Sequence, residues 1–191
     1  MKEHLKIALR FTIITTFLFG VLYPLIVTGL SQLVFPHQAN GSLISKNGVI
    51  AGSNLIGQPF SSDKYFHSRP SNAGSGYDAT ASTGSNLGPT NKQLIDRVHS
   101  DVTKLQQENP GEPIPADLVT SSGSGLDPDI SPGSAAFQIP RIAKARGVHP
   151  DQLKALVLSH LEGRQFGLFG ESRINVLQLN LDLDSKYPVA Q

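Results

Sequence analysis

The stretch FTIITTFLFGVLYPLIVTGLSQLVF, residues 11–35, contains no charged side chain. As a helix rising about 1.5 Å per residue it would be roughly 37 Å long, enough to cross a hydrocarbon core of about 30 Å with some tilt. Secretion signals have apolar cores of only about 7–15 residues and end at a small-residue cleavage site. The sequence PHQAN after Phe35 offers no such site, and a buried core helix seldom runs this long without a charge. The stretch therefore predicts a retained transmembrane helix.

Positive charges flank this predicted span on one side only. Lys2, Lys6 and Arg10 precede it, whereas residues 11–45 contain no Lys or Arg. Cytoplasmic flanks of membrane helices are enriched in these residues. We therefore expect residues 1–10 to be a cytoplasmic tail, 11–35 a single membrane span and 36–191 an extracytoplasmic domain.

Small, polar or helix-perturbing residues recur at every fourth position of the span. They are Thr12, Thr16, Gly20, Pro24, Thr28 and Gln32. Such residues let helix backbones approach closely in lipid, and the carbonyl freed by a proline is commonly satisfied with the help of a neighbouring helix. We expect Thr16, Gly20, Pro24 and Thr28 to pack against a membrane partner. The alternative is a lone tether that merely tolerates them.

The chain after the span is long enough for one hydrophobic core, and its composition predicts a loop-rich α+β domain. The whole sequence has 18 glycines and 13 prolines. The segment SLISKNGVIAGS at 42–53 predicts a β-hairpin with a type I′ turn at Asn47-Gly48, because both residues tolerate positive φ. Residues 71–90 and 115–134, rich in Gly, Ser and Pro, predict two long loops.

Periodicity places three helices and one strand in the domain. The first helix begins at Thr90, which with Gln93 forms a capping box, and ends at Asn109. A second begins at Ser131-Pro132 and stops at Gly147, with Pro140 inside it as a kink or interruption. A third runs from His149-Pro150 to Gly163. Alternating apolar residues at 174–183, with a phase slip at 176–177, predict a bulged strand passing into a last helical turn.

Motifs for enzymatic chemistry are scarce. The sequence has no GxxxxGK[ST], GxGxxG or GxSxG motif, and its six histidines lack the close pairing of a metal site. The balance of 16 basic and 15 acidic residues gives no sign of nucleic-acid binding. His67 in YFHSRPS and the pair Asp127 and Asp129 in GLDPDIS are the only catalytic candidates. A polar loop cluster and ordinary turn chemistry explain them equally well.

Seven segments in order resemble the C subunit of the bacterial Kdp-type potassium-transporting ATPase. They are YPLIVTGLSQLVFPHQANGSLI (23–44), GSNLIGQPF (52–60), YFHSRPS (65–71), GSNLGPTN (84–91), ADLVTSSGSGLDPDISPGSA (116–135), RIAKARGV (141–148) and INVLQLNLDLD (174–184). The resemblance covers nearly the whole chain. It implies a single-pass, non-catalytic accessory subunit in the bacterial inner membrane, whose partners are an ATPase subunit and a potassium-channel-like subunit. The rival expectations are a membrane-anchored exported hydrolase and an adhesive domain on a tether.

The same resemblance implies a link to ATP. The family's C subunit is described as a catalytic chaperone that raises the pump's affinity for ATP, through a ternary complex in which a Ser/Gly-rich block contacts nucleotide. The matching block here is Ser82, Thr83, Gly84, Ser85 and Asn86. Where the family has consecutive glycines this chain has Thr83-Gly84, and a β-branched residue restricts close backbone approach to phosphate. The block would also lie outside the cytoplasm, where the ATP is, so we expect any effect on ATP to be indirect.

Overall fold

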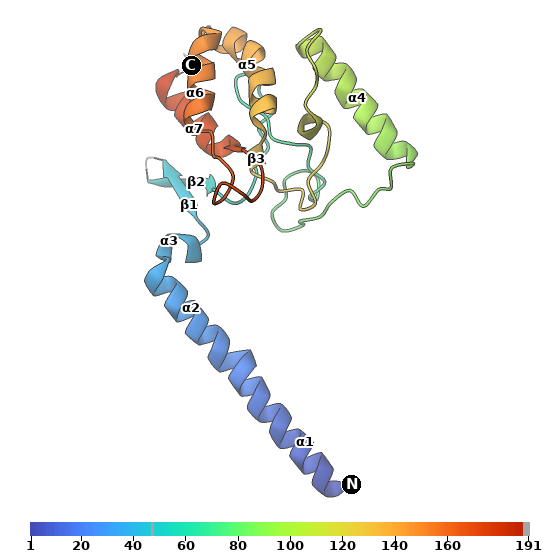
Figure 1. The fold of residues 1–191 in the computed structure, drawn as a ribbon, viewed down its shortest axis with the longest axis vertical. Helices are drawn as coiled ribbons and strands as arrows, with labels where there is room; N and C mark the ends of the chain where they lie inside the picture. Colours follow the sequence, from blue (N-terminus) through green and yellow to red (C-terminus); the bar gives the residue numbers. More distant parts are fainter. Residues whose placement is uncertain (47, 189–191) are drawn as a thin grey trace. The chain divides into compact units, whose positions relative to one another are not determined.

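The computed structural model describes residues 1–46 and 48–188. These form two compact units, one ending at Ala51 and one beginning at Gly52. The second unit, which holds most of the chain, mixes helices with two very short strands (Figure 1). This agrees with the predicted mixed α+β class.

The first unit is dominated by one continuous helix from Lys2 to Val34. It consists of α1 (Lys2–Thr15), a π-helical segment η1 (Thr16–Leu22) and α2 (Tyr23–Val34). The helix is long and apolar enough to cross a membrane, and none of its apolar window is buried against other parts of the chain. The predicted span is thus helical, and the helix also takes in the charged residues before it.

A short helix and a hairpin follow the long helix. In α3 (Pro36–Ala39) the chain turns, and the side-chain amides of Gln32 and Asn40 exchange two hydrogen bonds of 3.3 Å across the bend. Strands β1 (Leu43–Lys46) and β2 (Val49–Ser53) then pair in a two-stranded sheet, as predicted. The predicted type I′ turn includes Asn47, which lies outside the described residues.

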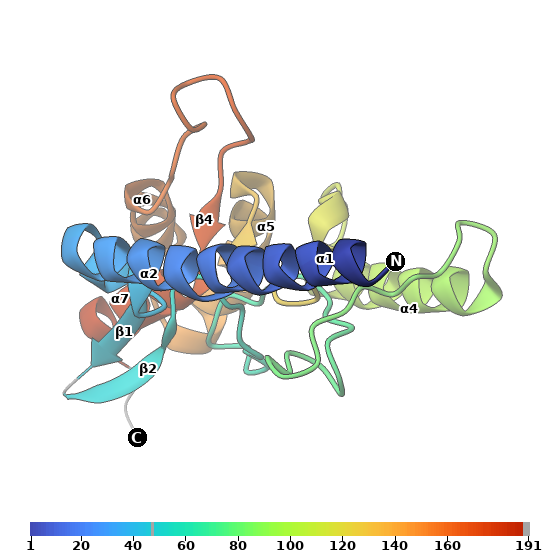
Figure 2. The same ribbon diagram turned by 90° about the horizontal axis from the view of Figure 1, so that it is seen from below.

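Three helices and a two-stranded ribbon form the core of the second unit. They are α5 (Pro132–Arg146), α6 (Pro150–Ser159), α7 (Val176–Lys186), β3 (Asp129–Ile130) and β4 (Ile174–Asn175). The strands are antiparallel, with Ile130 opposite Ile174. The chain between α6 and β4 extends away from the helices as a loop (Figure 2).

The core cluster draws on all of these elements and on one loop residue. Its members are Phe66, Ile130, Ala135, Ile139, Ile142, Ala143, Leu153, Leu156, Val157, Ile174, Val176, Leu179 and Leu183. Phe66 comes from the segment between β2 and α4 (Lys92–Glu108), which has no regular secondary structure. The predicted loop at 71–90 is therefore confirmed, and it continues from a stretch that is anchored in the core.

Helix α5 begins and ends as its sequence predicts but is not interrupted. Ser131 caps it by accepting a hydrogen bond from the Ser134 N–H at 3.0 Å, and Gly147 ends it in a left-handed conformation, φ +67°. The helix continues through Pro140, so the predicted interruption is wrong, whereas a kink at this residue stays a prediction. Ala136, whose carbonyl the proline leaves unpaired, is exposed on the same side as Pro140, and water can satisfy that carbonyl.

Two predicted helix ends were misplaced. The N-cap of α4 is Asn91 and not Thr90, and its side chain accepts from the Gln93 N–H at 2.8 Å. Helix α6 begins at the predicted His149 cap but ends at Ser159 rather than near Gly163. Ends that depend on a few local hydrogen bonds are the least certain part of such predictions.

The strand predicted for 174–183 is wrong beyond its first two residues. Asn175 instead caps α7, accepting a hydrogen bond from the Gln178 N–H at 3.1 Å. The buried residues then follow helical spacing: Val176, Leu177, Leu179, Asn180 and Leu183. Asn180 is polar but faces the core, so it interrupts the apolar stripe in the sequence and leaves the alternating leucines as the stronger pattern.

Candidate functional site

Two buried amide side chains hold the irregular segment that carries the sequence YFHSR. Asn180 on α7 accepts a hydrogen bond from the Phe66 N–H and donates one to the Phe66 carbonyl, both at 2.9 Å. Gln138 on α5 pairs with His67 in the same way, at 2.7 and 3.1 Å. Both amides are buried. Because unpaired polar groups are costly in a core, these four bonds fix the segment as a neighbouring strand would.

Two arginines tie the same segment to the helices. The side chain of Arg146 is 0% exposed, pairs with Asp184 at 2.8 Å and lies 4.8 Å from the centre of the Tyr65 ring. Arg141 pairs with Glu108 of α4 at 2.8 Å and donates to the Tyr65 carbonyl at 3.0 Å. Burial raises the pKa of the Tyr65 phenol, and its hydrogen bond to Asp184 adds to the effect.

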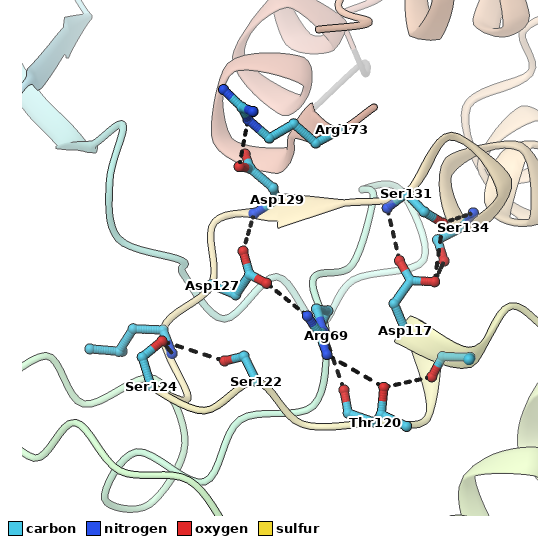
Figure 3. A network of polar contacts seen from close by, with 12 residues as sticks. Arg69, Asp117, Thr120, Ser122, Ser124, Asp127, Asp129, Ser131, Ser134 and Arg173 are labelled. Carbon is cyan, nitrogen blue, oxygen red and sulfur yellow. Dashed lines mark hydrogen bonds and ion pairs between the residues drawn. The ribbon is translucent and has the colours of Figure 1, made fainter. Parts of the chain in front are cut away.

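A chain of ion pairs crosses the loop that precedes α5 (Figure 3). Arg69 pairs with Asp127 at 2.9 Å, and Asp127 accepts a hydrogen bond from the backbone N–H of Asp129 at 3.1 Å. Asp129 in turn pairs with Arg173 at 3.2 Å. The structure therefore brings together the two acidic candidates from the sequence, and each of them is neutralised by an arginine.

A cleft of about 510 Å³ opens beside these ion pairs. Burial raises the pKa of Asp129, and the nearby charge of Asp127 raises it further. The described residues lining the cleft include Thr120 and Ser131 but no histidine. The Ser131 hydroxyl donates a hydrogen bond to the Asp117 carboxylate at 3.1 Å, and the Ser131 N–H donates to the same carboxylate at 2.8 Å. Asp117 therefore holds the residue that caps α5.

His67 lies at a second cleft of about 380 Å³, whose lining also includes Ser68, Tyr77 and Leu105. Its Nε2 lies 3.0 Å from the Ser62 carbonyl, so this nitrogen carries the proton in the neutral ring. Burial lowers the pKa of His67. The His67 ring therefore helps to fix the loop that contains Ser62, through this hydrogen bond. Within 1–46 and 48–188, moreover, no group of three or more His, Cys, Asp or Glu residues is placed to hold a metal ion.

The Ser/Gly-rich block at 82–86 forms hydrogen bonds within itself and with the loop that contains Ser124. The Ser82 hydroxyl donates to the Ser124 carbonyl at 2.9 Å, and the Asn86 amide lies 3.5 Å from the Thr83 hydroxyl. Helix α4 begins only at Lys92, so the block is not at a helix N-terminus, where backbone N–H groups bind phosphate.

Close backbone packing joins this block to the loop at 122–125. A Cβ atom added to Gly84 would lie 3.0 Å from the Gly123 carbonyl oxygen, and one added to Gly125 would lie 2.6 Å from the Thr83 oxygen. Gly125 also has φ +67°, a conformation that favours glycine. The glycines in these two loops therefore allow the loops to meet.

The row predicted for helix packing lies on the exposed surface of the long helix. Thr16, Gly20, Pro24 and Thr28 are all exposed within this chain. A Cβ atom added to Gly20 would lie 3.7 Å from the Thr16 side chain and would meet no other neighbour within 4 Å. The row is available to a partner, and its packing stays a prediction.

Comparison with known proteins identifies the family. The family model described as K+-transporting ATPase, c chain, matches residues 5–185. The chain belongs to this family. It is 54% identical over 189 residues to the potassium-transporting ATPase KdpC subunit of Koribacter versatilis, covering 99% of this chain and 98% of that protein. The KdpC subunits of Caulobacter vibrioides and of Rhodopseudomonas palustris (strain BisB18) are 54% and 52% identical, each covering at least 96% of both chains.

Sequence reasoning missed the residues that organise this family member's domain. Gln138 and Asn180 were not singled out, although each is a polar residue within an apolar helical face. Arg69 lies two residues after His67 in the YFHSRPS segment and has no sequence signal that sets it apart. A lone amide on a core-facing stripe is the signal that could have found the first two, because a buried amide requires hydrogen-bond partners.

Proposed function

We propose that this chain is a non-catalytic accessory subunit of an ATP-driven potassium importer, held in the bacterial inner membrane by its N-terminal helix. The observation that carries the proposal is the family match over residues 5–185, together with the unburied apolar helix at Lys2–Val34. Its partners are the ATPase subunit and the potassium-channel-like subunit. The paired carboxylates Asp127 and Asp129 give no support to a hydrolase.

Purification from potassium-starved cells tests this role. A tagged full-length chain, solubilised gently from membranes, is expected to bring down an ATPase subunit and a channel-like subunit, identified by mass spectrometry. Isolation of the chain alone under conditions that preserve other membrane complexes would contradict the proposal and favour a tethered adhesive domain.

The orientation we propose places the N-terminus in the cytoplasm and the second unit outside. Lys2, Lys6 and Arg10 all precede the apolar stretch, which supports this direction. The chain has no native cysteine, so Ser82→Cys creates a single reactive thiol. We expect a membrane-impermeant maleimide to label it in cells whose outer membrane is permeable. Labelling only after the inner membrane is opened would indicate the opposite topology, with the second unit in the cytoplasm.

An extracytoplasmic domain cannot touch cytoplasmic ATP, so we propose that it raises ATP affinity indirectly. In this proposal the domain covers the outer mouth of the channel-like subunit, stabilises the assembly and is coupled to the nucleotide site through the other subunits. Substituting Ser82 and Ser85 by alanine should leave the ATP affinity of the complex unchanged. A clear loss of affinity in an intact, fully assembled complex would instead support direct contact by 82–86.

We further propose that the helix docks through Thr16, Gly20, Pro24 and Thr28. Replacing all four with leucine preserves an apolar span but removes the small surface that allows close packing. The variant should remain in the membrane yet co-purify poorly with the other subunits. A matched variant with leucine at four other exposed positions of the helix controls for the effect of making four leucine substitutions anywhere in it. These positions are Phe11, Phe17, Ile26 and Val34.

A further inference from the structure

The chain between α6 and β4 forms a narrow projecting hairpin, residues 162–173, which we name the finger (Figure 2). Glu162 and Arg173 exchange two backbone hydrogen bonds at its base, of 2.9 and 3.0 Å. Gln165 and Phe169 exchange two more near its tip, of 2.9 and 3.0 Å. The finger is therefore an ordered structure that continues from β4 in the core.

The tip of the finger adopts an unfavourable backbone conformation. Phe166 and Gly167 have φ of +54° and +73°, and the Leu168 N–H donates to the Gln165 carbonyl at 3.1 Å. This is the pattern of a type I′ turn, which normally places Asn, Asp or Gly at both central positions. A bulky aromatic residue with positive φ is an outlier that costs free energy.

The apolar side chains at the tip of the finger are largely exposed. Phe166 is 85% exposed, Leu168 75% and Phe169 66%. Three large apolar side chains thus lie exposed within four residues at the end of a hydrogen-bonded hairpin. Strained residues persist where the strain serves a function, and an apolar cluster of this kind marks an interaction site.

The charges on the finger favour a protein partner over a lipid surface. Arg164 pairs with Glu171 through two contacts, of 2.8 and 2.7 Å. Arg173 pairs with Glu162 at 2.8 Å and with Asp129 at 3.2 Å. Elements that bind bilayer surfaces combine an apolar face with basic residues that attract anionic headgroups. The finger has the apolar residues, but both of its arginines are paired with carboxylates.

We propose that the finger inserts Phe166, flanked by Leu168 and Phe169, into an apolar pocket on another subunit of the transport complex. This inference rests on the proposed function, which supplies the partner. A pre-ordered anchor loses little conformational entropy on binding, and an aromatic side chain in a fully desolvated pocket is typical of an interface hot spot. The partner surface is expected to be an apolar cavity with an uncharged floor.

The variant Phe166→Asn tests this directly, because asparagine tolerates the left-handed turn while removing the anchor. The full-length variant should melt at the wild-type temperature or above it. Expressed with the other subunits, it should dissociate from the purified complex roughly thirtyfold faster, the size of a hot-spot loss. The control Leu158→Gln removes another exposed apolar side chain, on α6, and should dissociate like wild type.

The outcomes separate this inference from the function on which it rests. Failure of the wild-type chain to co-purify would contradict the proposed function itself. Wild-type co-purification with equal retention of Phe166→Asn would overturn the finger's role alone. So would weaker binding of the variant to phosphatidylethanolamine–phosphatidylglycerol vesicles with unchanged subunit retention, because that result assigns the tip to lipid.

Discussion

Helix α4 and the irregular segment at 65–69 are held in opposite ways. Helix α4 is a regular helix of 17 residues, yet none of its residues is buried. The neighbouring segment has no regular secondary structure, but its Phe66 is 0% exposed and its backbone is paired by the buried amides Gln138 and Asn180. Regular hydrogen bonding along a helix satisfies the backbone without fixing the helix to the domain. How firmly a segment is held depends on burial and on contacts from elsewhere in the chain.

The comparison is tested most strongly by truncating one apolar side chain in each region. Phe66→Ala should destabilise the second unit by about 4 kcal/mol, because it leaves a cavity in the core. Leu105→Ala on α4 should cost about 1 kcal/mol, since that side chain is only half-buried. The free energy of unfolding can be followed in detergent by tyrosine fluorescence, because three of the four tyrosines lie in the second unit and the chain has no tryptophan. Equal losses of unfolding free energy in the two variants would show that the two regions are held equally firmly.

The next effect concerns the buried amides. Asn180→Leu should cost roughly 3 kcal/mol, because the Phe66 N–H and carbonyl lose their partners while remaining inside the core. Gln106→Leu, an exposed amide on α4, serves as the control and should change stability by less than about 0.5 kcal/mol. The same unfolding measurement applies. A loss at Asn180 no greater than at Gln106 would mean that water replaces the missing bonds.

A smaller effect is expected where the two Ser/Gly-rich loops meet. Gly125→Ala should cost about 2 kcal/mol, since its Cβ would lie within 2.7 Å of backbone atoms of Thr83 and Ala73. Gly123→Ala meets nothing within 4 Å and should be nearly neutral. The difference in thermal midpoint between these two variants measures how much the contact between the two loops contributes to stability. Similar midpoints would show that the loops separate easily.

The smallest effect is the pH dependence contributed by His67. Burial, with help from the charge of Arg141, lowers its pKa in the folded state below the ordinary 6.5. The unfolded chain therefore binds this proton more readily, and stability should fall as pH decreases from 6.5 toward the folded-state pKa. His67→Gln should flatten this part of the profile. His99→Gln, an exposed position on α4, is the matched control; equal slopes in both variants would contradict the prediction.

The elements that the sequence predicted well have signals within a few residues. The long N-terminal helix follows from the uncharged stretch, and α5 and α6 begin at caps, Ser131 and His149, that are followed by proline. The hairpin at 42–53 likewise follows from apolar segments around a turn dipeptide. In each case local chemistry and the tertiary structure favour the same conformation.

The features that the sequence did not predict depend on contacts between distant residues. Helix α7 was taken for a strand because buried Asn180, whose partner Phe66 lies 114 positions away, breaks its apolar stripe. The pairing of Asp127 with Arg69 and of Asp129 with Arg173 is equally non-local. The sequence raised both carboxylates as catalytic candidates, and only the fold shows that arginines neutralise them.

The π-helical segment Thr16–Leu22 has a consequence for how the N-terminal helix can vary in length. Each of its wide turns takes up about one more residue than an α-helical turn. Losing one residue here would let the segment revert to α-helical winding with nearly the same number of turns. The helix surfaces before and after the segment would then keep nearly the same relative direction. The same deletion within α1 or α2 would instead rotate one flank by about 100° relative to the other.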